Sequence, residues 1–168
     1  MSTMNVLICQ QPKELVWKQR EIPIPGDNEA LIKIKSVGIC GTDIHAWGGN
    51  QPFFSYPRVL GHEICGEIVG LGKNIADLKN GQQVAVIPYV ACQQCPACKS
   101  GRTNCCEKIS VIGVHQDGGF SEYLSVPVAN ILPADGIDPQ AAALIEPFAI
   151  SAQFGSGRHL VQADLHAA

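Results

Sequence analysis

The sequence predicts a mostly β fold with short helices, in which antiparallel strands form a small barrel-like domain. Three features lead to this prediction: 17 Gly and 11 Pro are spread along the 168 residues, short apolar segments recur between turn residues, and an Asp-Gly-Gly turn precedes one of these segments. The length allows one well-buried domain and is too short for two of ordinary size. We therefore expect a single hydrophobic core.

Six segments have the pattern of β-strands. They are residues 6–8, 15–18, 31–35, 60–71, 83–87 and 120–124. Residues 31–35 read LIKIK, so this strand should have one face in water. Residues 21–28 form a Pro/Gly turn segment, and Asp117-Gly118-Gly119 predicts a hairpin turn into the last strand.

The C-terminal part contains the clearest helix signal. Residues 138–152 should begin as a helix, with Asp138 as the N-cap and Pro139 at the first helical position. Residues 153–168 have neither strand nor clear helix character. We therefore expect a domain over residues 1–152 and an unmatched tail over residues 153–168.

Charge and composition exclude several classes of partner. The formal net charge is -3 and no basic block is present, so neither nucleic acid nor an anionic membrane would find a cationic surface to bind. The N-terminus has no export signal, and no apolar stretch approaches the roughly 18 residues of a membrane span. We expect a soluble cytoplasmic protein, in which reduced cysteines favour metal binding over disulfides.

A cysteine-dense segment at about residues 91–110 has no hydrophobic periodicity and needs something other than a core to order it. Its spacing is C-x2-C-x2-C-x7-C, formed by Cys92, Cys95, Cys98 and Cys106. Four thiolates suit a tetrahedral structural zinc, although disulfides or an iron–sulfur cluster are alternative interpretations. Zinc is favoured because an export signal and the ferredoxin spacing are both missing. Cys105 should be a spare thiol that could replace Cys106, and Cys9 and Cys65 should be buried.

Cys40, His62 and Glu63 form a second set of potential metal ligands. A thiolate, an imidazole and a carboxylate suit zinc, and three protein ligands leave a position for a substrate oxygen. From the spacing alone, His62 and Glu63 fit a hydrogen-bonded structural pair in an apolar strand at least as well. The residues by themselves leave both interpretations open.

The order of several motifs is similar to that of the zinc-dependent medium-chain dehydrogenases. The motifs are GICGTDIH, YPRVLGHEICGEIVGLG, the four-cysteine segment, DGGFSEY and IEPF. They cover about residues 5–152, and they resemble the polyol and sugar-acid branch, in particular the L-galactonate 5-dehydrogenase type. This resemblance implies a GroES-like antiparallel β-barrel with a zinc-stabilised loop lobe, two zinc ions per chain, and oxidation of a secondary alcohol by NAD(P).

The resemblance also implies a ligand set for the catalytic zinc. Cys40 and His62 match two of the family's ligands, and Glu63 matches a carboxylate that binds zinc directly in many polyol enzymes or by exchange in others. Glu146 falls where liver-type alcohol dehydrogenases have a cysteine as their third ligand. Which glutamate binds the ion is therefore open, and Asp43 matches the carboxylate that orients the histidine ligand.

Residues for proton transfer follow from the same comparison. Thr42 matches the hydroxyl that relays the substrate proton, and His45 matches the outer end of that relay, where an imidazole passes the proton to water. Trp47 and Phe53 lie on the loop that borders the substrate cleft in relatives, with a plain core role as the alternative. His115 has no assignable partner and should be structural, and His159 and His166 lie in the unmatched tail.

A nucleotide-binding domain should be absent from this chain. The family fingerprint Gly-x-Gly-x-x-Gly follows a strand, whereas Gly155-Ser156-Gly157 has no third glycine and no preceding strand. We expect NAD(P) to bind only in full-length relatives, which act on a small alcohol, polyol or sugar acid, and we expect this chain alone to be inactive. The alternative function is a zinc-stabilised interaction module. Apolar residues at 141–144 and 148–152 predict self-association.

Overall fold

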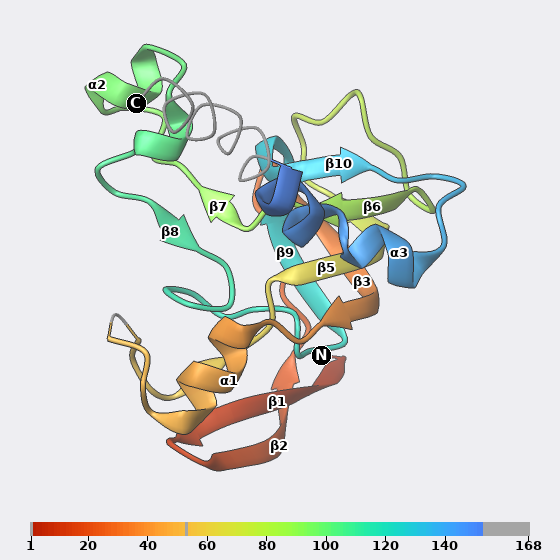
Figure 1. Cartoon of the computed structure of the whole chain (residues 1–168). Helices are drawn as coiled ribbons and strands as arrows, with labels where there is room; N and C mark the ends of the chain where they lie inside the picture. The colour runs from red at the N-terminus through yellow and green to blue at the C-terminus, as the bar shows by residue number, and fades with distance from the viewer. Residues whose placement is uncertain (1, 53, 153–168) are drawn as a thin grey trace, which may run out of the picture.

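Two antiparallel sheets form most of the molecule in the computed structural model, which describes residues 2–52 and 54–152 (Figure 1). The five-stranded sheet has the order β10-β6-β5-β3-β9. These strands are β10 (Ile131–Pro133), β6 (Gln83–Val86), β5 (Glu63–Leu71), β3 (Glu29–Gly38) and β9 (Tyr123–Pro127). The three-stranded sheet has the order β2-β1-β4, with β2 (Glu14–Glu21), β1 (Thr3–Gln11) and β4 (Arg58–Val59).

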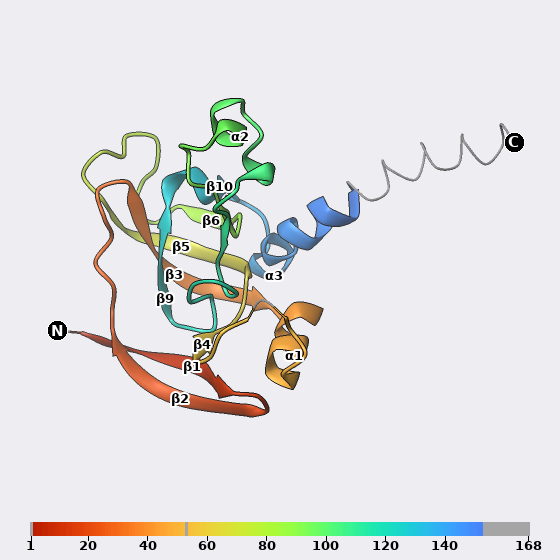
Figure 2. The ribbon, with the colours of Figure 1, turned by 90° about the vertical axis from the view of Figure 1, so that its left-hand side faces the viewer.

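Short elements complete the fold. β7 (Tyr89–Val90) and β8 (Ser110–Val111) form a two-stranded ribbon. This ribbon leads to and from the cysteine-dense segment at about residues 91–110, which we call the cysteine lobe. The helices are α1 (Gly41–Gly48), α2 (Pro96–Lys99) and α3 (Pro139–Ala143), with 3₁₀ turns η1 (Thr103–Cys105) and η2 (Val128–Asn130). Residues 145–152 are also helical. Figures 1 and 2 both show the lobe with α2 projecting beyond the barrel at the end of this ribbon.

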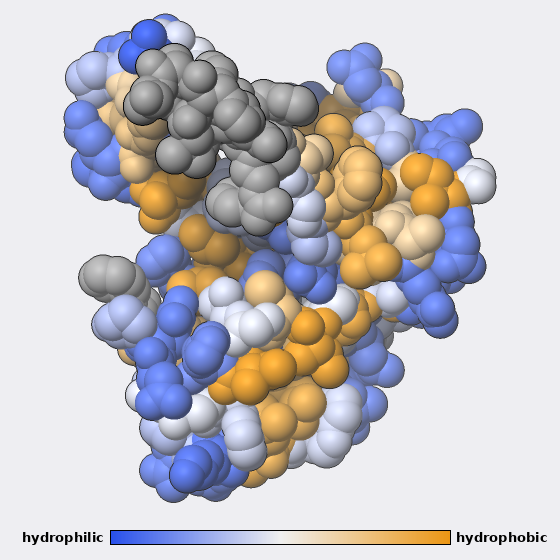
Figure 3. Space-filling model, viewed as in Figure 1, coloured by the Kyte–Doolittle hydropathy of each residue, from blue (hydrophilic) through white to orange (hydrophobic). Residues whose placement is uncertain are grey.

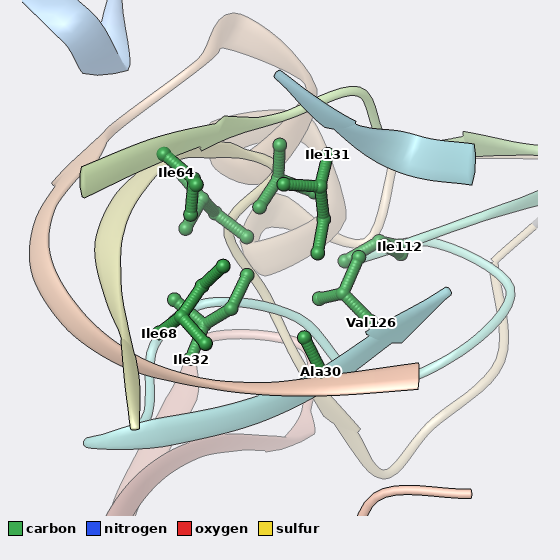
Figure 4. Close-up of a cluster of buried hydrophobic side chains, with 9 residues drawn as sticks. Ala30, Ile32, Ile64, Ile68, Ile112, Val126 and Ile131 are labelled. Atoms are coloured by element: carbon green, nitrogen blue, oxygen red, sulfur yellow. The ribbon is translucent and has the colours of Figure 1, made fainter. Parts of the chain in front are cut away.

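The sheets enclose one main core, as a barrel requires. A bridge between Val6 and Ser121 joins the small sheet to the segment that leads into β9. Branched apolar side chains from β3, β5, β6, β9 and β10 meet in the interior, and Figure 4 shows them pointing toward one another. They include Ile32, Ile64, Ile68, Val84 and Val126, all at most 1% exposed. Burial of this surface is the main stabilising term of the fold, and the predicted mostly β architecture is confirmed.

The predicted hairpin at Asp117-Gly118-Gly119 is wrong, because the segment does not connect two paired strands. β9 pairs with β3 and β8 pairs with β7. Instead the two glycines run alongside the chain that precedes β5: Gly118 N donates to Val59 O at 2.8 Å, and Gly119 N donates to Gly61 O at 2.8 Å. A β-carbon at Gly118 would overlap Gly61 O, so the glycine permits a close approach of two backbones rather than a turn.

The helices differ in how well local signals predicted them. α3 begins as expected, since Asp138 Oδ1 accepts hydrogen bonds from Gln140 N at 2.9 Å and Ala141 N at 3.2 Å. α1 was not predicted. It has only eight residues, Gly at both ends and no Ser, Thr, Asn or Asp at its N-cap, which is Cys40. Within the described residues no helix is long and apolar enough to cross a membrane.

Candidate metal centres

The first candidate metal centre lies where β3, β5 and the start of α1 meet. Gly38 at the end of β3 pairs with Glu63 at the start of β5. This register brings Cys40, which follows β3, beside His62, which precedes β5. The ligand atoms of Cys40, His62 and Glu63 all lie within 4.8 Å of one another. The structure thus brings together three residues from separate motifs, with His62 and Glu63 buried and Cys40 half-buried.

Gly38 is part of this centre, although the sequence pattern did not single it out. A β-carbon at this position would overlap Glu63 Oε2 and would lie 2.9 Å from Glu63 Cβ. Any larger residue would therefore displace the carboxylate. The glycine at the end of the GICGTDIH strand was visible in the sequence, but only the pairing of Gly38 with Glu63 explains why it is needed.

Asp43 connects the three ligands to the barrel. Its Oδ2 accepts a hydrogen bond from Cys40 N at 3.0 Å, and its Oδ1 accepts one from Gly61 N at 2.9 Å. The same Oδ1 lies 3.8 Å from His62 Nδ1. The carboxylate favours a proton on Nδ1, which leaves the lone pair of Nε2 free for a metal ion. Asp43 is 3% exposed and holds both neighbouring ligand segments.

The chemistry of this group fits zinc. Thiolate, imidazole and carboxylate are ligands that zinc accepts together, and three of them leave one position open. His62 Nδ1 is buried and has no hydrogen-bond partner among the described residues. This nitrogen lies 3.8 Å from the Asp43 carboxylate, so a metal ion bound at Nε2 is compatible with this geometry.

The two predicted proton-transfer residues are on α1. Thr42 is half-buried beside Cys40, and His45 is exposed one turn further along the helix. This arrangement is compatible with a path from an inner hydroxyl to an outer imidazole in contact with water. Both residues therefore lie on the helix that is capped at its N-terminus by the candidate ligand Cys40.

Trp47 lines a cavity rather than the core. The cavity has a volume of about 350 Å³ and Asp43 is its one polar residue. The apolar residues around it are Leu7, Leu15, Val37, Ile39, Ile44, Trp47, Leu60 and Phe120. Figure 3 shows apolar surface gathered beside α1, on the side of β1. Cys40, His62 and Glu63 do not line this cavity, so the cleft-bordering position of Trp47 stays a prediction, and Phe53 lies outside the described residues.

Glu146 is not a member of the three-residue group. It lies on the helical segment 145–152, is half-buried, and accepts a hydrogen bond at Oε1 from the Tyr89 hydroxyl at 2.6 Å. Burial, this hydrogen bond, and the charges of Glu146 and Cys40 raise the pKa of Tyr89 above its usual value. Tyr89 is a second residue of this region that the sequence pattern did not indicate.

The second candidate centre is the cysteine lobe. The sulfur atoms of Cys92, Cys95, Cys98 and Cys106 all lie within 4.8 Å of one another. Cys92 and Cys98 Sγ are 4.0 Å apart. A tetrahedral zinc with bonds of about 2.3 Å requires sulfur–sulfur distances of about 3.8 Å, so the group fits the ion. None of the eight cysteines is in a disulfide, and Cys105 is exposed outside the group.

Backbone amides in the lobe favour thiolates. Cys95 N donates to Cys92 Sγ at 3.4 Å, and Cys92 N donates to Cys106 Sγ at 3.3 Å. Hydrogen bonds from the amides of Gln94 and Cys95 lower the pKa of Cys92 to about 6. Burial raises the pKa of Cys98 to about 12. Four thiolates at this spacing would repel one another, and a divalent cation bound among them would remove that repulsion.

Other histidines and cysteines occupy structural positions. His115 Nδ1 accepts a hydrogen bond from Val111 N at 3.0 Å, which agrees with the structural role expected for it. Cys9 and Cys65 are both fully buried in apolar clusters, as predicted. Gly155, Gly157, His159 and His166 lie outside the described residues.

The family of this chain follows from comparison with known proteins. The model of the alcohol dehydrogenase GroES-like domain matches residues 26–136. The chain belongs to the zinc-type medium-chain alcohol dehydrogenase family. This result agrees with the motifs, with the mostly β fold and with the two ligand groups.

Several alcohol dehydrogenase relatives match nearly the whole described chain. Starvation-sensing protein RspB of Escherichia coli K12 is 43% identical over 151 residues, which are 89% of this chain and 44% of that protein. The L-threonine 3-dehydrogenase of Chelativorans sp. is 35% identical over 150 residues, 86% of this chain and 43% of that enzyme. The chain therefore spans somewhat less than half the length of these relatives.

Solved dehydrogenase structures agree with the fold. The crystal structure of an RspB alcohol dehydrogenase from E. coli CFT073, complexed with NADH, matches with a TM-score of 0.83 and 42% identity over 90% of this chain and 44% of that one. Galactitol-1-phosphate dehydrogenase from E. coli matches with a TM-score of 0.81 and 34% identity over 86% of this chain and 42% of that one.

Proposed function

We propose that this chain is the zinc-binding catalytic part of an NAD(P)-dependent alcohol dehydrogenase and that it binds two zinc ions. The observation that carries the proposal is the pair of separate ligand groups. One has four thiols and is closed, as structural zinc sites are, and the other has three ligands of mixed type and is open. The proposed unit is residues 1–152, with its structural lobe at about residues 91–110.

The residues around the open group suit removal of a proton from an alcohol. A zinc ion bound there would act as a Lewis acid and lower the pKa of the alcohol. Thr42 would accept the proton at its hydroxyl, and exposed His45 would pass it to water, because an imidazole can both accept and donate a proton. Asp43 would keep His62 in the orientation and protonation state that a ligand needs.

We propose a small polyol, sugar acid or related hydroxylated compound as the substrate of the whole enzyme. Two supporting relatives, an L-threonine 3-dehydrogenase and a galactitol-1-phosphate dehydrogenase, are named for small hydroxylated substrates. NADH in the RspB structure supports a nicotinamide cofactor. The motif resemblance to the L-galactonate 5-dehydrogenase type makes L-galactonate the first compound to test.

The metal content of a His62→Ala variant tests the catalytic-type site. We expect parent protein to contain two zinc ions per chain and His62→Ala to contain one, because removal of one of three protein ligands weakens binding strongly. The melting temperature should change little, since β3 and β5 are ordered by the apolar core. Metal analysis after dialysis, with thermal unfolding by circular dichroism, measures both quantities.

His45→Ala is the matched control, because His45 is exposed and outside the ligand group. It should keep both zinc ions. Two zinc ions in His62→Ala, or a parent protein with a single ion held by the lobe, would refute the proposal for the Cys40, His62 and Glu63 site.

We also propose that the chain self-associates through the helix at 145–152. Phe148 and Ile150 on this helix are 74% and 54% exposed, and Leu144 just before it is 55% exposed. Figure 2 shows this helix projecting from the barrel. Part of the patch expected from the sequence is instead core, because Ala142 and Ala143 pack with Cys65. Exposed apolar side chains gathered on one element favour association in water.

Light scattering at tens of micromolar measures this association. We expect a dimer or larger species, and Phe148→Asp should shift the mass toward the monomer. Ile24→Asp is the matched control, since Ile24 is 91% exposed but lies on a different segment. A monomeric parent protein at this concentration would contradict the proposal.

A further inference from the structure

A short hydrogen bond joins Tyr89 and Glu146, two residues outside the open ligand group. The Tyr89 hydroxyl donates a hydrogen bond to Glu146 Oε1 at 2.6 Å. Charge-assisted bonds of this length are among the stronger hydrogen bonds in proteins. A carboxylate engaged in this way loses that bond if it turns toward a metal ion.

The backbone of Tyr89 is fixed independently of Glu146. The buried Asn130 side chain donates through Nδ2 to Ile87 O at 2.7 Å and to Tyr89 O at 3.0 Å. Tyr89 also pairs with Val111 in the β7–β8 ribbon. The Tyr89 backbone is therefore held by the Asn130 side chain and by the β7–β8 ribbon, which limits where its hydroxyl can lie.

Glu146 follows shortly after a well-packed element, α3. Ala142 and Ala143 of α3 are buried against Cys65 and Ala85 of the barrel. The helical segment 145–152 follows directly, so Glu146 enters the region from one side while Tyr89 enters from another. Burial, the Glu146 hydrogen bond and the charge of Glu146 raise the pKa of Tyr89 most, and the charge of Cys40 adds to the same shift.

We propose that Tyr89 is a positioning residue that holds the Glu146 carboxylate outside the ligand group and so leaves Glu63 as the third protein ligand. This inference rests on the proposed zinc site at Cys40, His62 and Glu63. The chain has two candidate glutamate ligands, and this inference explains why only one of them would bind the ion. Glu63 packs next to Gly38 within the ligand group, whereas Glu146 accepts the hydrogen bond from Tyr89.

Cobalt absorption provides a test that does not depend on catalysis. Co²⁺ replaces zinc in the open site while the lobe keeps zinc, as metal analysis verifies, and the ligand-field bands then report the number and type of ligands. Tyr89→Phe keeps the ring but frees Glu146. We expect it to change these bands and to slow the release of Co²⁺ to a chelator by about tenfold, because a further carboxylate becomes available.

Two further variants separate a specific effect from a general one. Tyr89→Phe/Glu146→Gln should restore the parent spectrum and release rate, because the freed side chain is no longer an anionic ligand. Tyr123→Phe, which removes a hydroxyl on β9, should behave like the parent protein. Bands in Tyr89→Phe identical to those of the parent protein, or a change that persists in the double variant, would overturn the inference.

Failure of the underlying site would have a different signature. If the parent protein and His62→Ala bind the same amount of Co²⁺, the proposed zinc site is wrong and the inference falls with it. If only His62→Ala loses Co²⁺ while Tyr89→Phe is unchanged, the site stands and only the role of Tyr89 is refuted.

Discussion

Cys98→Ser is expected to remove one zinc ion per chain and to unfold the lobe at about residues 91–110 while the five-stranded sheet stays folded. The buried cluster of the lobe consists of Cys95, Cys98 and Cys106, with few apolar neighbours. Its regular elements are the four-residue α2 and the three-residue η1. A structural zinc contributes about 10–16 kcal/mol of binding free energy in small zinc domains, and nothing else in the lobe replaces that term.

Metal analysis together with hydrogen exchange measures both parts of this expectation. Amides of the lobe should exchange at least about tenfold faster, whereas amides of β3 and β5 should keep their protection. Cys105→Ser is the matched control, since Cys105 is exposed and outside the ligand group. Iron with visible absorption in the parent protein, or a Cys98→Ser lobe that stays protected with two zinc ions, would contradict the assignment.

We expect these 168 residues alone to show no measurable NAD(P)-dependent oxidation of an alcohol. Hydride transfer needs an acceptor held about 3–3.5 Å from the substrate carbon. In dinucleotide-binding α/β folds, a Gly-rich turn after a parallel strand holds the cofactor that supplies this acceptor. Within residues 2–52 and 54–152 every strand ladder is antiparallel. Without a positioned acceptor, the activation free energy rises by about 7–11 kcal/mol, which lowers the rate by roughly 10⁵–10⁸-fold.

The assay uses the zinc-loaded chain with a panel of polyols and sugar acids, L-galactonate included, and follows NADH or NADPH at 340 nm. Galactitol-1-phosphate dehydrogenase from E. coli, with galactitol 1-phosphate as its substrate, serves as the positive control for the assay. Turnover that disappears in Cys40→Ser and His62→Ala would show this expectation wrong. It would also mean that other residues of this chain, or a second chain, bind the nucleotide.

The sequence by itself determined the features that depend on neighbours in the chain. Zinc-type spacing of the four lobe cysteines was visible because the ligands lie within fifteen positions, and their sulfur atoms do meet. The cap at Asp138 is likewise local, since its partners are two and three residues away. The apolar pattern identified the central strands, because alternation along a strand directly reports which side chains face the core.

Only the tertiary structure decided the features that depend on pairing between distant segments. Residues 117–119 have the composition of a hairpin turn, yet they serve as a close backbone contact with residues 59–61, which no local pattern encodes. The role of Gly38 exists only because β3 pairs with β5 in one register. The different placement of Glu63 and Glu146 depends on Tyr89, which Asn130 holds from 41 positions away. A sequence pattern identifies candidate ligands, but strand register and packing determine which of these side chains lie close together.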